Sequence, residues 1–205
     1  MKCLLCAVYG VLCGGGILMR TVSRIMGNWT DSARELGRLK SIVICGIMAA
    51  LAVVLSFTGT IRIGSYIRIG LSGVPERMVN FLYGPVVGGI FGAMLDILEY
   101  IVTPSGAFFP GFTISAALTG ILYGAFLYKR KLTVWSVLIP EILVRVFVNL
   151  ILNTYWLTIL YGEGFFVLLP GRVASNLIQI PFETALIYLV LQATSRIAAK
   201  TGLTE

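Results

Sequence analysis

The property that most constrains this chain is the length of its apolar segments. Crossing the hydrocarbon layer of a bilayer, which is about 30 Å thick, takes about 20 consecutive helical residues, and three apolar runs reach that length. Apolar residues make up 58% of the 205 residues and charged residues only 12%, which is more apolar surface than a soluble domain of this size can bury. Lipid offers open backbone groups no hydrogen-bond partner, so the spans must be helical. The sequence therefore predicts an all-α integral membrane protein.

Six transmembrane helices are predicted from the apolar runs and the turn residues between them. Their expected ranges are 41–58, 71–83, 86–102, 112–128, 134–160 and 169–193. Lysine and arginine gather before the first span, between the fourth and fifth spans, and after the sixth span. With six spans these three clusters share one side of the membrane, and basic loops are typical of the cytoplasmic side. We therefore expect cytoplasmic termini, a location in the prokaryotic cytoplasmic membrane, and outward-facing loops at 59–70, 103–111 and 161–168.

The chain divides into an N-terminal extension with a polar lead-in, residues 1–40, and a membrane domain, residues 41–205. The first part of the extension is apolar and could form a signal peptide or an additional helix. It could also lie upstream of the true start, since Met19 and Met26 are alternative initiators. We favour this last interpretation, in which residues 1–25 are absent from the mature protein, because everything after Met26 is self-sufficient.

Residues that the chain lacks exclude several functional classes. It contains no histidine, which rules out histidine-based catalysis and histidine metal ligation, and we predict no catalytic residues, no metal site and no cofactor. No Gly-x-x-x-x-Gly-Lys-Ser/Thr phosphate loop is present, so the chain cannot hydrolyse ATP by that route. The net charge of +7 comes from basic residues at helix ends, which indicates membrane orientation rather than nucleic-acid binding.

Polar residues inside the predicted spans are the candidates for function, because a charged side chain costs a few kcal/mol at the bilayer centre unless it is paired. On the fifth span Arg145 lies near the midplane, and Asn149 and Asn153 follow at i+4 steps towards the outer end. Arg172 and Asn176 descend from the outer end of the sixth span. Together these side chains predict a polar pocket that opens outward.

The deepest charges also have a structural interpretation. Glu141 and Arg145 are i,i+4 partners that can neutralise one another, as can Glu76 or Glu183 with Arg77. We expect these pairs to be structural and the polar residues of the outer half to bind a ligand.

Small residues recur on the first span at Gly46-x-x-x-Ala50 and Ala52-x-x-x-Ser56. This spacing lets helices approach closely in lipid. Packing within the bundle explains it about as well as a docking face for another membrane subunit. The candidate docking residues are Gly46, Ala49, Ala50, Ala52 and Ser56.

Several motifs are specific enough to indicate a family. They are Asp31-Ser-Ala-Arg-Glu35, Tyr83-Gly-Pro-Val-Val-Gly88, Phe108-Phe-Pro-Gly-Phe-Thr113, Asn149-Leu-Ile-Leu-Asn-Thr-Tyr-Trp-Leu157, and Leu169-Pro-Gly-Arg172 with Pro181-Phe-Glu183. Through them, residues 28–194 resemble the folate-type substrate-binding (S) components of energy-coupling factor (ECF) transporters. The resemblance implies a six-helix bundle that is not an enzyme, binds a vitamin tightly near the outer face, and delivers it through a membrane scaffold (T) subunit and two ATPases.

Folate is the vitamin that the resemblance favours, and its chemistry suits the polar residues of the outer half. The two carboxylates of its glutamate tail suit arginine, and the donors and acceptors of its pterin edge suit asparagine or aspartate. Its ring would stack on tryptophan or phenylalanine. The predicted substrate-binding residues are Arg68, Asp96, Phe109, Asn149, Asn153, Trp156, Arg172 and Asn176.

Two alternatives stay open on the sequence alone. The chain could serve the same mechanism with another vitamin or heterocycle, or it could be a solitary membrane transporter or channel. Genes for a scaffold subunit and paired ATPases would favour an S component over the second alternative.

Overall fold

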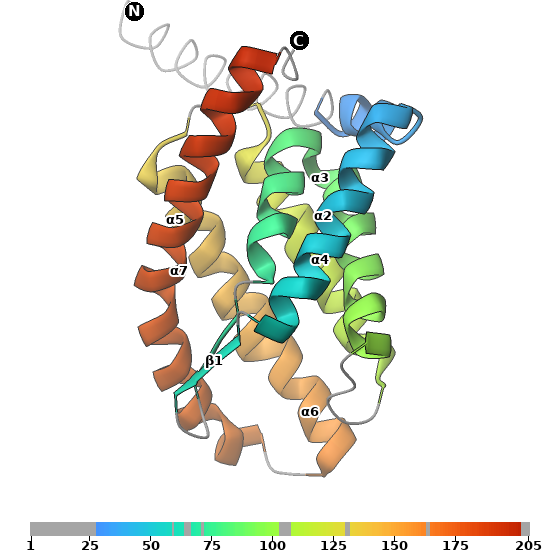
Figure 1. The fold of residues 1–205 in the computed structure, drawn as a ribbon. Helices are drawn as coiled ribbons and strands as arrows, with labels where there is room; N and C mark the ends of the chain where they lie inside the picture. Colours follow the sequence, from blue (N-terminus) through green and yellow to red (C-terminus); the bar gives the residue numbers. More distant parts are fainter. Residues whose placement is uncertain are drawn as a thin grey trace, which may run out of the picture.

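The computed structural model describes residues 28–58, 60–63, 67–70, 72–102, 108–129, 132–162 and 165–201. Over these residues the chain forms a bundle of long helices that lie side by side (Figure 1). The elements are α2 (Leu39–Thr58), β1 (Thr60–Ile63), β2 (Ile67–Gly70), α3 (Gly73–Val102), α4 (Pro110–Leu127), α5 (Val134–Leu143), η1 (Val144–Leu152), α6 (Asn153–Tyr161) and α7 (Phe165–Thr201). The prediction for residues 1–25 lies outside the described residues.

Five helical segments of the described chain are long and apolar enough to cross a membrane. They are Leu39–Phe57, Gly73–Val102, Pro110–Leu127, Val134–Leu160 and Leu169–Arg196. Large apolar side chains such as Ile47, Phe57 and Leu177 remain exposed on their outer surfaces, where lipid rather than protein would cover them. The expectation of a helical, multi-pass membrane protein is confirmed.

The helix α3 consists of two arms that fold back on one another at Gly84. This residue has φ 85° and ψ −168°, a conformation that glycine adopts without the steric cost a side chain would add, and Pro85 follows it. A Cβ atom on Gly92 would lie 3.3 Å from Glu76 Oε1, although positions 76 and 92 would be about 24 Å apart along a straight helix. The arms 73–83 and 85–102 are therefore antiparallel, and the reversal occurs where the sequence predicts one span to end.

Two short strands lie within the range 59–70, which the sequence predicts to be a loop, in a chain whose other described elements are helices. β1 and β2 pair in the antiparallel sense, with Arg62 opposite Arg68 and Ile61 opposite Ile69. The physical reason is visible in the sequence. Isoleucine alternates with threonine or arginine with the period of two that is typical of a strand.

The fifth predicted span is continuous but not uniformly α-helical. Its middle third, η1, is a π-helix, in which backbone N–H groups bond five residues back instead of four, and α6 resumes the α-helical pattern. The predicted alignment of the asparagines is present, because Asn153 Nδ2 donates to Asn149 Oδ1 at 3.1 Å. A π-helical insertion shifts the faces of the following helix, so it changes which side chains point into the bundle.

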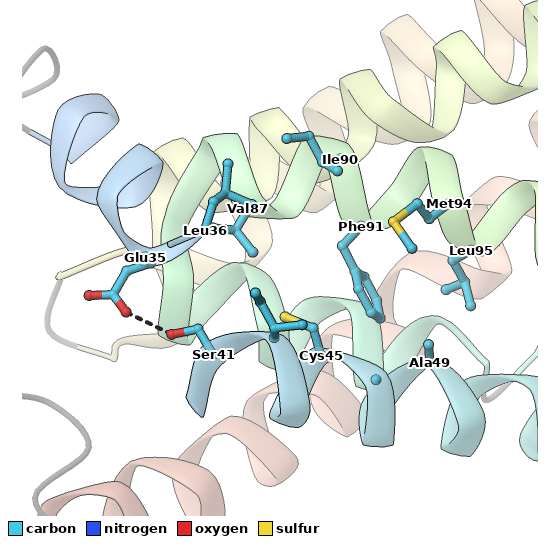
Figure 2. A pocket seen from close by; sticks show the side chains of 12 residues that line it. Glu35, Leu36, Ser41, Cys45, Ala49, Val87, Ile90, Phe91, Met94 and Leu95 are labelled. Carbon is cyan, nitrogen blue, oxygen red and sulfur yellow. Dashed lines mark hydrogen bonds between the residues drawn. The ribbon is translucent and has the colours of Figure 1, made fainter. Parts of the chain in front are cut away.

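Two apolar clusters hold the bundle together. One joins α4, α5, η1 and α7 around Tyr123, Val137, Val148 and Leu191. The other joins α2 to α3 around Ala52, Val79, Tyr83, Val87, Phe91 and Leu95. Beside the second cluster, α2 and the second arm of α3 enclose a groove, whose lining residues are shown in Figure 2.

Residues 28–35 form a short helical segment that is tied to the reversal in α3. The fully buried Ser32 hydroxyl accepts hydrogen bonds from the backbone N–H groups of Val86 and Val87, at 3.0 and 3.2 Å. It thereby caps the N-terminus of the second arm, whose first N–H groups have no partner within the helix. Nearby, Lys129 Nζ lies 2.6 Å from Asp31 Oδ2 and lowers the pKa of that carboxyl group.

Candidate substrate-binding site

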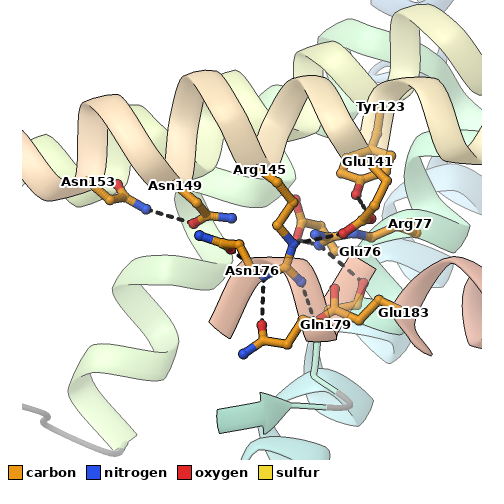
Figure 3. A network of polar contacts seen from close by, with 11 residues as sticks. Glu76, Arg77, Tyr123, Glu141, Arg145, Asn149, Asn153, Asn176, Gln179 and Glu183 are labelled. Carbon is orange, nitrogen blue, oxygen red and sulfur yellow. Dashed lines mark hydrogen bonds and ion pairs between the residues drawn. The ribbon is translucent and has the colours of Figure 1, made fainter. Parts of the chain in front are cut away.

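In the part of the chain that the structure describes, Arg145 of η1 contacts four polar side chains (Figure 3). Its guanidinium lies 2.8 Å from Glu141 Oε1 on α5 and 2.5 Å from Glu183 Oε1 on α7. It also donates to Asn176 Oδ1 at 3.0 Å and to Gln179 Oε1 at 2.7 Å, both on α7. Arg145 is thus held by two carboxylates and two amides, which join the fifth span to α7.

A second arginine continues this arrangement towards α3 and α4. Arg77 pairs with Glu76 at 2.5 Å, and its guanidinium carbon lies 4.5 Å from the centre of the Tyr123 ring. The Tyr123 hydroxyl donates to Glu141, which connects the two arginines (Figure 3). We call this set the arginine network; it comprises Glu76, Arg77, Tyr123, Glu141, Arg145, Asn176, Gln179 and Glu183.

Of the structural pairs expected from sequence, Glu141 with Arg145 and Glu76 with Arg77 are present. The alternative partner for Arg77, Glu183, instead pairs with Arg145. Every charged member of the network has an ion-pair partner within it, although Glu76 Oε1 and Arg77 Nε are buried without a hydrogen-bond partner. The pairing of the charges is the arrangement expected of a structural network.

Arg172, near the N-terminal end of α7, has a different environment. It donates from NH1 to the backbone carbonyl of Asn149 at 3.1 Å and to Thr154 Oγ1 at 3.4 Å. Among the described residues no carboxylate lies within ion-pairing distance of it. Its positive charge is therefore hydrogen-bonded but not neutralised.

The Asn149 carbonyl that Arg172 contacts lies where the π-helix returns to an α-helix. The Asn153 N–H still bonds five residues back, to Val148, and α6 begins at that same residue. The next carbonyl in order, that of Asn149, accepts from Arg172 and lies 3.5 Å from the Thr154 hydroxyl. The Arg172 and Thr154 side chains thus donate to the Asn149 carbonyl at the point where the backbone hydrogen bonds change from the π-helical to the α-helical pattern.

Trp156 follows Asn153 by three residues on α6 and contacts another aromatic side chain. The rings of Phe109 and Trp156 are 5.4 Å apart at 48°, and the Trp156 indole N–H donates to Ser115 Oγ on α4 at 3.2 Å. Asn153 Oδ1 is buried without a hydrogen-bond partner, which is unusual for a buried acceptor. This combination of an unsatisfied acceptor and aromatic faces can receive a flat molecule with hydrogen-bonding edges.

The three remaining residues that were predicted to bind the substrate belong to α3, α7 and β2; they are Asp96, Asn176 and Arg68. Asp96 accepts a 2.7 Å hydrogen bond from Thr113 and so joins α3 to α4. Asn176 belongs to the arginine network, although it is one helical turn from Arg172. Arg68 belongs to β2, and its side chain lies outside the described residues.

Sequence reasoning missed Ser115 and Thr154 as parts of this region. Both are buried, and each contacts a predicted residue, Trp156 and Arg172 respectively. The available signal was weak. A hydroxyl residue in an apolar helix commonly bonds its own backbone, and only the tertiary fold shows a second partner.

The candidate docking residues divide between two faces of α2. Gly46 and Ala50 are exposed, and Ala49 and Ser56 are partly exposed. Ala52 is completely buried in the cluster between α2 and α3, so it does not share the outer surface with the others. The described residues also contain no group of three or more cysteine or acidic side chains arranged to hold a metal ion.

Comparison with known proteins gives a consistent result. The family model for the substrate-specific component of ECF transporters matches residues 40–191. The folate transporter FolT of Clostridium novyi (strain NT) is 41% identical over 122 residues, which are 60% of this chain and 71% of that protein. The riboflavin transporter RibU of Staphylococcus aureus (strain TCH60) is 28% identical over 143 residues, which are 67% of this chain and 74% of that protein.

Among solved structures, the crystal structure of FolT bound with folic acid is similar to this chain, with a TM-score of 0.68 and 31% sequence identity. The similarity covers 75% of this chain and 93% of that chain. The family model spans most of the membrane-embedded part of the sequence, and its members are transporter components rather than enzymes. The chain belongs to the family of substrate-specific components of ECF transporters.

Proposed function

We propose that this protein is a folate-binding S component, which captures folate at the outer face of the cytoplasmic membrane. The observation that carries the proposal is Arg172, a guanidinium with no carboxylate partner among the described residues. An unneutralised arginine in a membrane bundle is costly, so it is typical of a site whose anion arrives with the ligand. The glutamate tail of folate supplies such an anion, and FolT, whose structure resembles this chain, is bound to folic acid.

In this proposal the ligand-binding residues are those predicted from the sequence. Arg172 and Arg68 bind the tail carboxylates, and Asn149 and Asn153 bind the pterin edge through their amides. The pterin ring stacks on Trp156 and Phe109, which already lie within stacking distance of one another. Asp96 and Asn176 complete the site, the latter by connecting it to the arginine network.

The proposed topology has six membrane crossings, because the two arms of α3 run in opposite directions. The ends of the bundle support cytoplasmic termini. Lys129 pairs with Asp31, and the described end of α7 lies at the same end of the bundle as residues 28–38 (Figure 1). The three basic clusters of the sequence thus share one end, as basic cytoplasmic segments do. The domain boundary proposed at residue 40 is supported by the family match, which begins at that residue.

Titration calorimetry of the purified protein against several vitamins tests the proposed ligand. We expect folate to bind and riboflavin to bind far more weakly, because riboflavin has no carboxylate to neutralise Arg172. Riboflavin is the informative comparison, since the family relatives include a riboflavin transporter. Binding of riboflavin with no binding of folate would replace the proposed ligand and keep the S-component function.

Delivery requires partners, which we propose to be a membrane scaffold subunit and two ATPases. The chain has no phosphate loop, so it should bind folate in liposomes without driving ATP-dependent uptake by itself. Sustained ATP-driven uptake by the isolated protein would contradict this proposal and favour a solitary transporter.

The docking face on α2 gives a sharper prediction. We expect Ala50→Trp to lower uptake by the complete transporter by about tenfold or more, since the added ring separates helices that must approach closely. Folate affinity should not change, because Ala50 is exposed and distant in sequence from the proposed contacts. Radiolabelled folate uptake and binding are measured on the same membranes.

Two matched variants separate docking from internal packing. Ile139→Trp places the same ring on an exposed position of α5 and should leave uptake near the wild-type rate. Ala52→Trp overpacks the cluster between α2 and α3 and should lower the thermal midpoint, with a cost of about 1–3 kcal/mol. Equal loss of folate binding in Ala50→Trp and Ala52→Trp would show that both residues serve packing.

A further inference from the structure

The groove between α2 and the second arm of α3 takes no part in the proposed substrate site, although two of its lining residues, Gly46 and Ala49, are also candidate docking residues. It has a volume of about 230 Å³ and is lined almost entirely by apolar side chains. Ile42, Cys45 and Ala49 line it from α2, and Ile90, Phe91 and Met94 line it from α3 (Figure 2). Both walls belong to segments apolar enough to cross a membrane, so the groove faces the region that lipid chains occupy.

One end of the groove is polar, and a cation is paired with the carboxylate that lines it. Ser41 Oγ donates to Glu35 Oε2 at 2.8 Å, and both residues line the groove. The other oxygen of Glu35 accepts from Arg38 NH1 at 2.7 Å, while 63% of the Arg38 side chain remains exposed. The Glu35 carboxylate therefore holds the Arg38 guanidinium beside the mouth of the groove.

The charge at this end favours an anionic occupant. Besides Arg38, the neighbouring Arg34 and Lys40 are exposed and basic. Of the nearby carboxylates, Glu35 is shared with Arg38 and Asp31 is paired with Lys129. An excess of positive charge therefore remains next to an apolar groove.

We propose that this groove binds one acyl chain of an anionic phospholipid, with its phosphate on Arg38. The dimensions agree, because the helix from Ser41 to Ala49 is about 12 Å long and one leaflet of the hydrocarbon layer is about 15 Å thick. Basic pockets between transmembrane helices on the cytoplasmic side bind anionic headgroups in this way. The inference does not depend on which vitamin the protein carries.

Native mass spectrometry of the full chain in a mild non-ionic detergent tests the proposal. The probes are phosphatidylglycerol and phosphatidylcholine with identical acyl chains, titrated separately. We expect one phosphatidylglycerol to bind about fivefold more tightly than phosphatidylcholine, which is the effect of about one basic residue at a membrane surface. Arg38→Gln should remove this preference and leave phosphatidylcholine binding unchanged.

A second pair of variants tests the groove itself. Gly46 lines the groove, and its Cβ position has no atom within 4 Å, so Gly46→Phe should fill the groove and weaken both lipids about tenfold by displacing several methylene groups. Ile47→Phe alters the adjacent exposed position, which is not a lining residue, and should bind both lipids as the wild type does.

Folate affinity and thermal midpoint should be unchanged in all three variants, which would confirm that each is folded. The proposal is overturned if Arg38→Gln keeps the wild-type preference for phosphatidylglycerol, or if Gly46→Phe binds both lipids normally. Unchanged lipid binding in Gly46→Phe together with failed assembly with the scaffold subunit would identify the groove as a protein-docking surface instead.

Discussion

Arg145→Ala is expected to destabilise the protein by about 3–5 kcal/mol, the cost of removing one partner from a buried ion pair. The substitution leaves Glu141, which is 1% exposed, and Glu183 without their cation. It also removes the donor to Asn176 and Gln179. Since typical domains are stable by only about 5–15 kcal/mol, we expect a much lower yield of monodisperse protein and a lower thermal midpoint in detergent.

A matched variant separates two causes of the lower stability: carboxylates left without a cation, and the packing lost with the arginine side chain. Replacing Arg145 by Met together with Glu141→Gln and Glu183→Gln removes the cation and both carboxylates while keeping similar volumes. This triple variant should be more stable than Arg145→Ala, because neutral amides cost less to bury than unpaired carboxylates. If Arg145→Ala has the wild-type thermal midpoint, the arginine network does not support the fold.

Arg172→Ala is expected to weaken folate binding by about 2–4 kcal/mol, the scale of losing one side of a buried charge-assisted pair. At 25 °C this is a change of about 30-fold to 1,000-fold in the dissociation constant. The protein should still fold, since no carboxylate among the described residues depends on Arg172. The Asn149 carbonyl would lose Arg172 as a donor but would keep the Thr154 hydroxyl as a hydrogen-bond donor. Affinity and thermal midpoint are measured in the same detergent.

A truncated ligand separates a contact with the tail from a structural role. A pterin without the aminobenzoyl-glutamate tail should bind the wild type and Arg172→Ala with similar affinity, because it has no carboxylate for the guanidinium. Arg172→Lys should recover part of the folate affinity, since an ammonium keeps the charge but not the paired donors of arginine. Equal loss for folate and for the truncated pterin would mean that Arg172 acts by holding the Asn149 carbonyl.

Some side-chain contacts around the candidate site were predictable from the sequence because their signals are local. Glu141 and Arg145 are four residues apart, which is about one helical turn, and so are Asn149 and Asn153 on the next segment. Residues at this spacing lie on the same face of a helix, so both contacts can be predicted from the sequence. The absence of an acid one turn from Arg172 was also visible along the chain. The partners from other helices, such as Glu183 for Arg145 and Ser115 for Trp156, were not predictable in this way.

The sequence by itself determined that the chain is a multi-pass helical membrane protein and where one predicted span gives way to the next, although α7, from Phe165 to Thr201, extends beyond the expected range 169–193. Apolar length and turn residues such as Gly84-Pro85 are local properties. Only the tertiary structure decided how each helix is rotated about its own axis, and therefore which of its side chains point into the bundle. It buried Ala52 while exposing Ala50 two residues earlier, and it inserted a π-helix at the centre of the fifth span. The physical reason is that lipid and protein interior are both apolar, so hydrophobicity does not mark which face of a membrane helix points inward. Close packing and pairing of the few polar groups determine that orientation, and both depend on residues far apart in the chain.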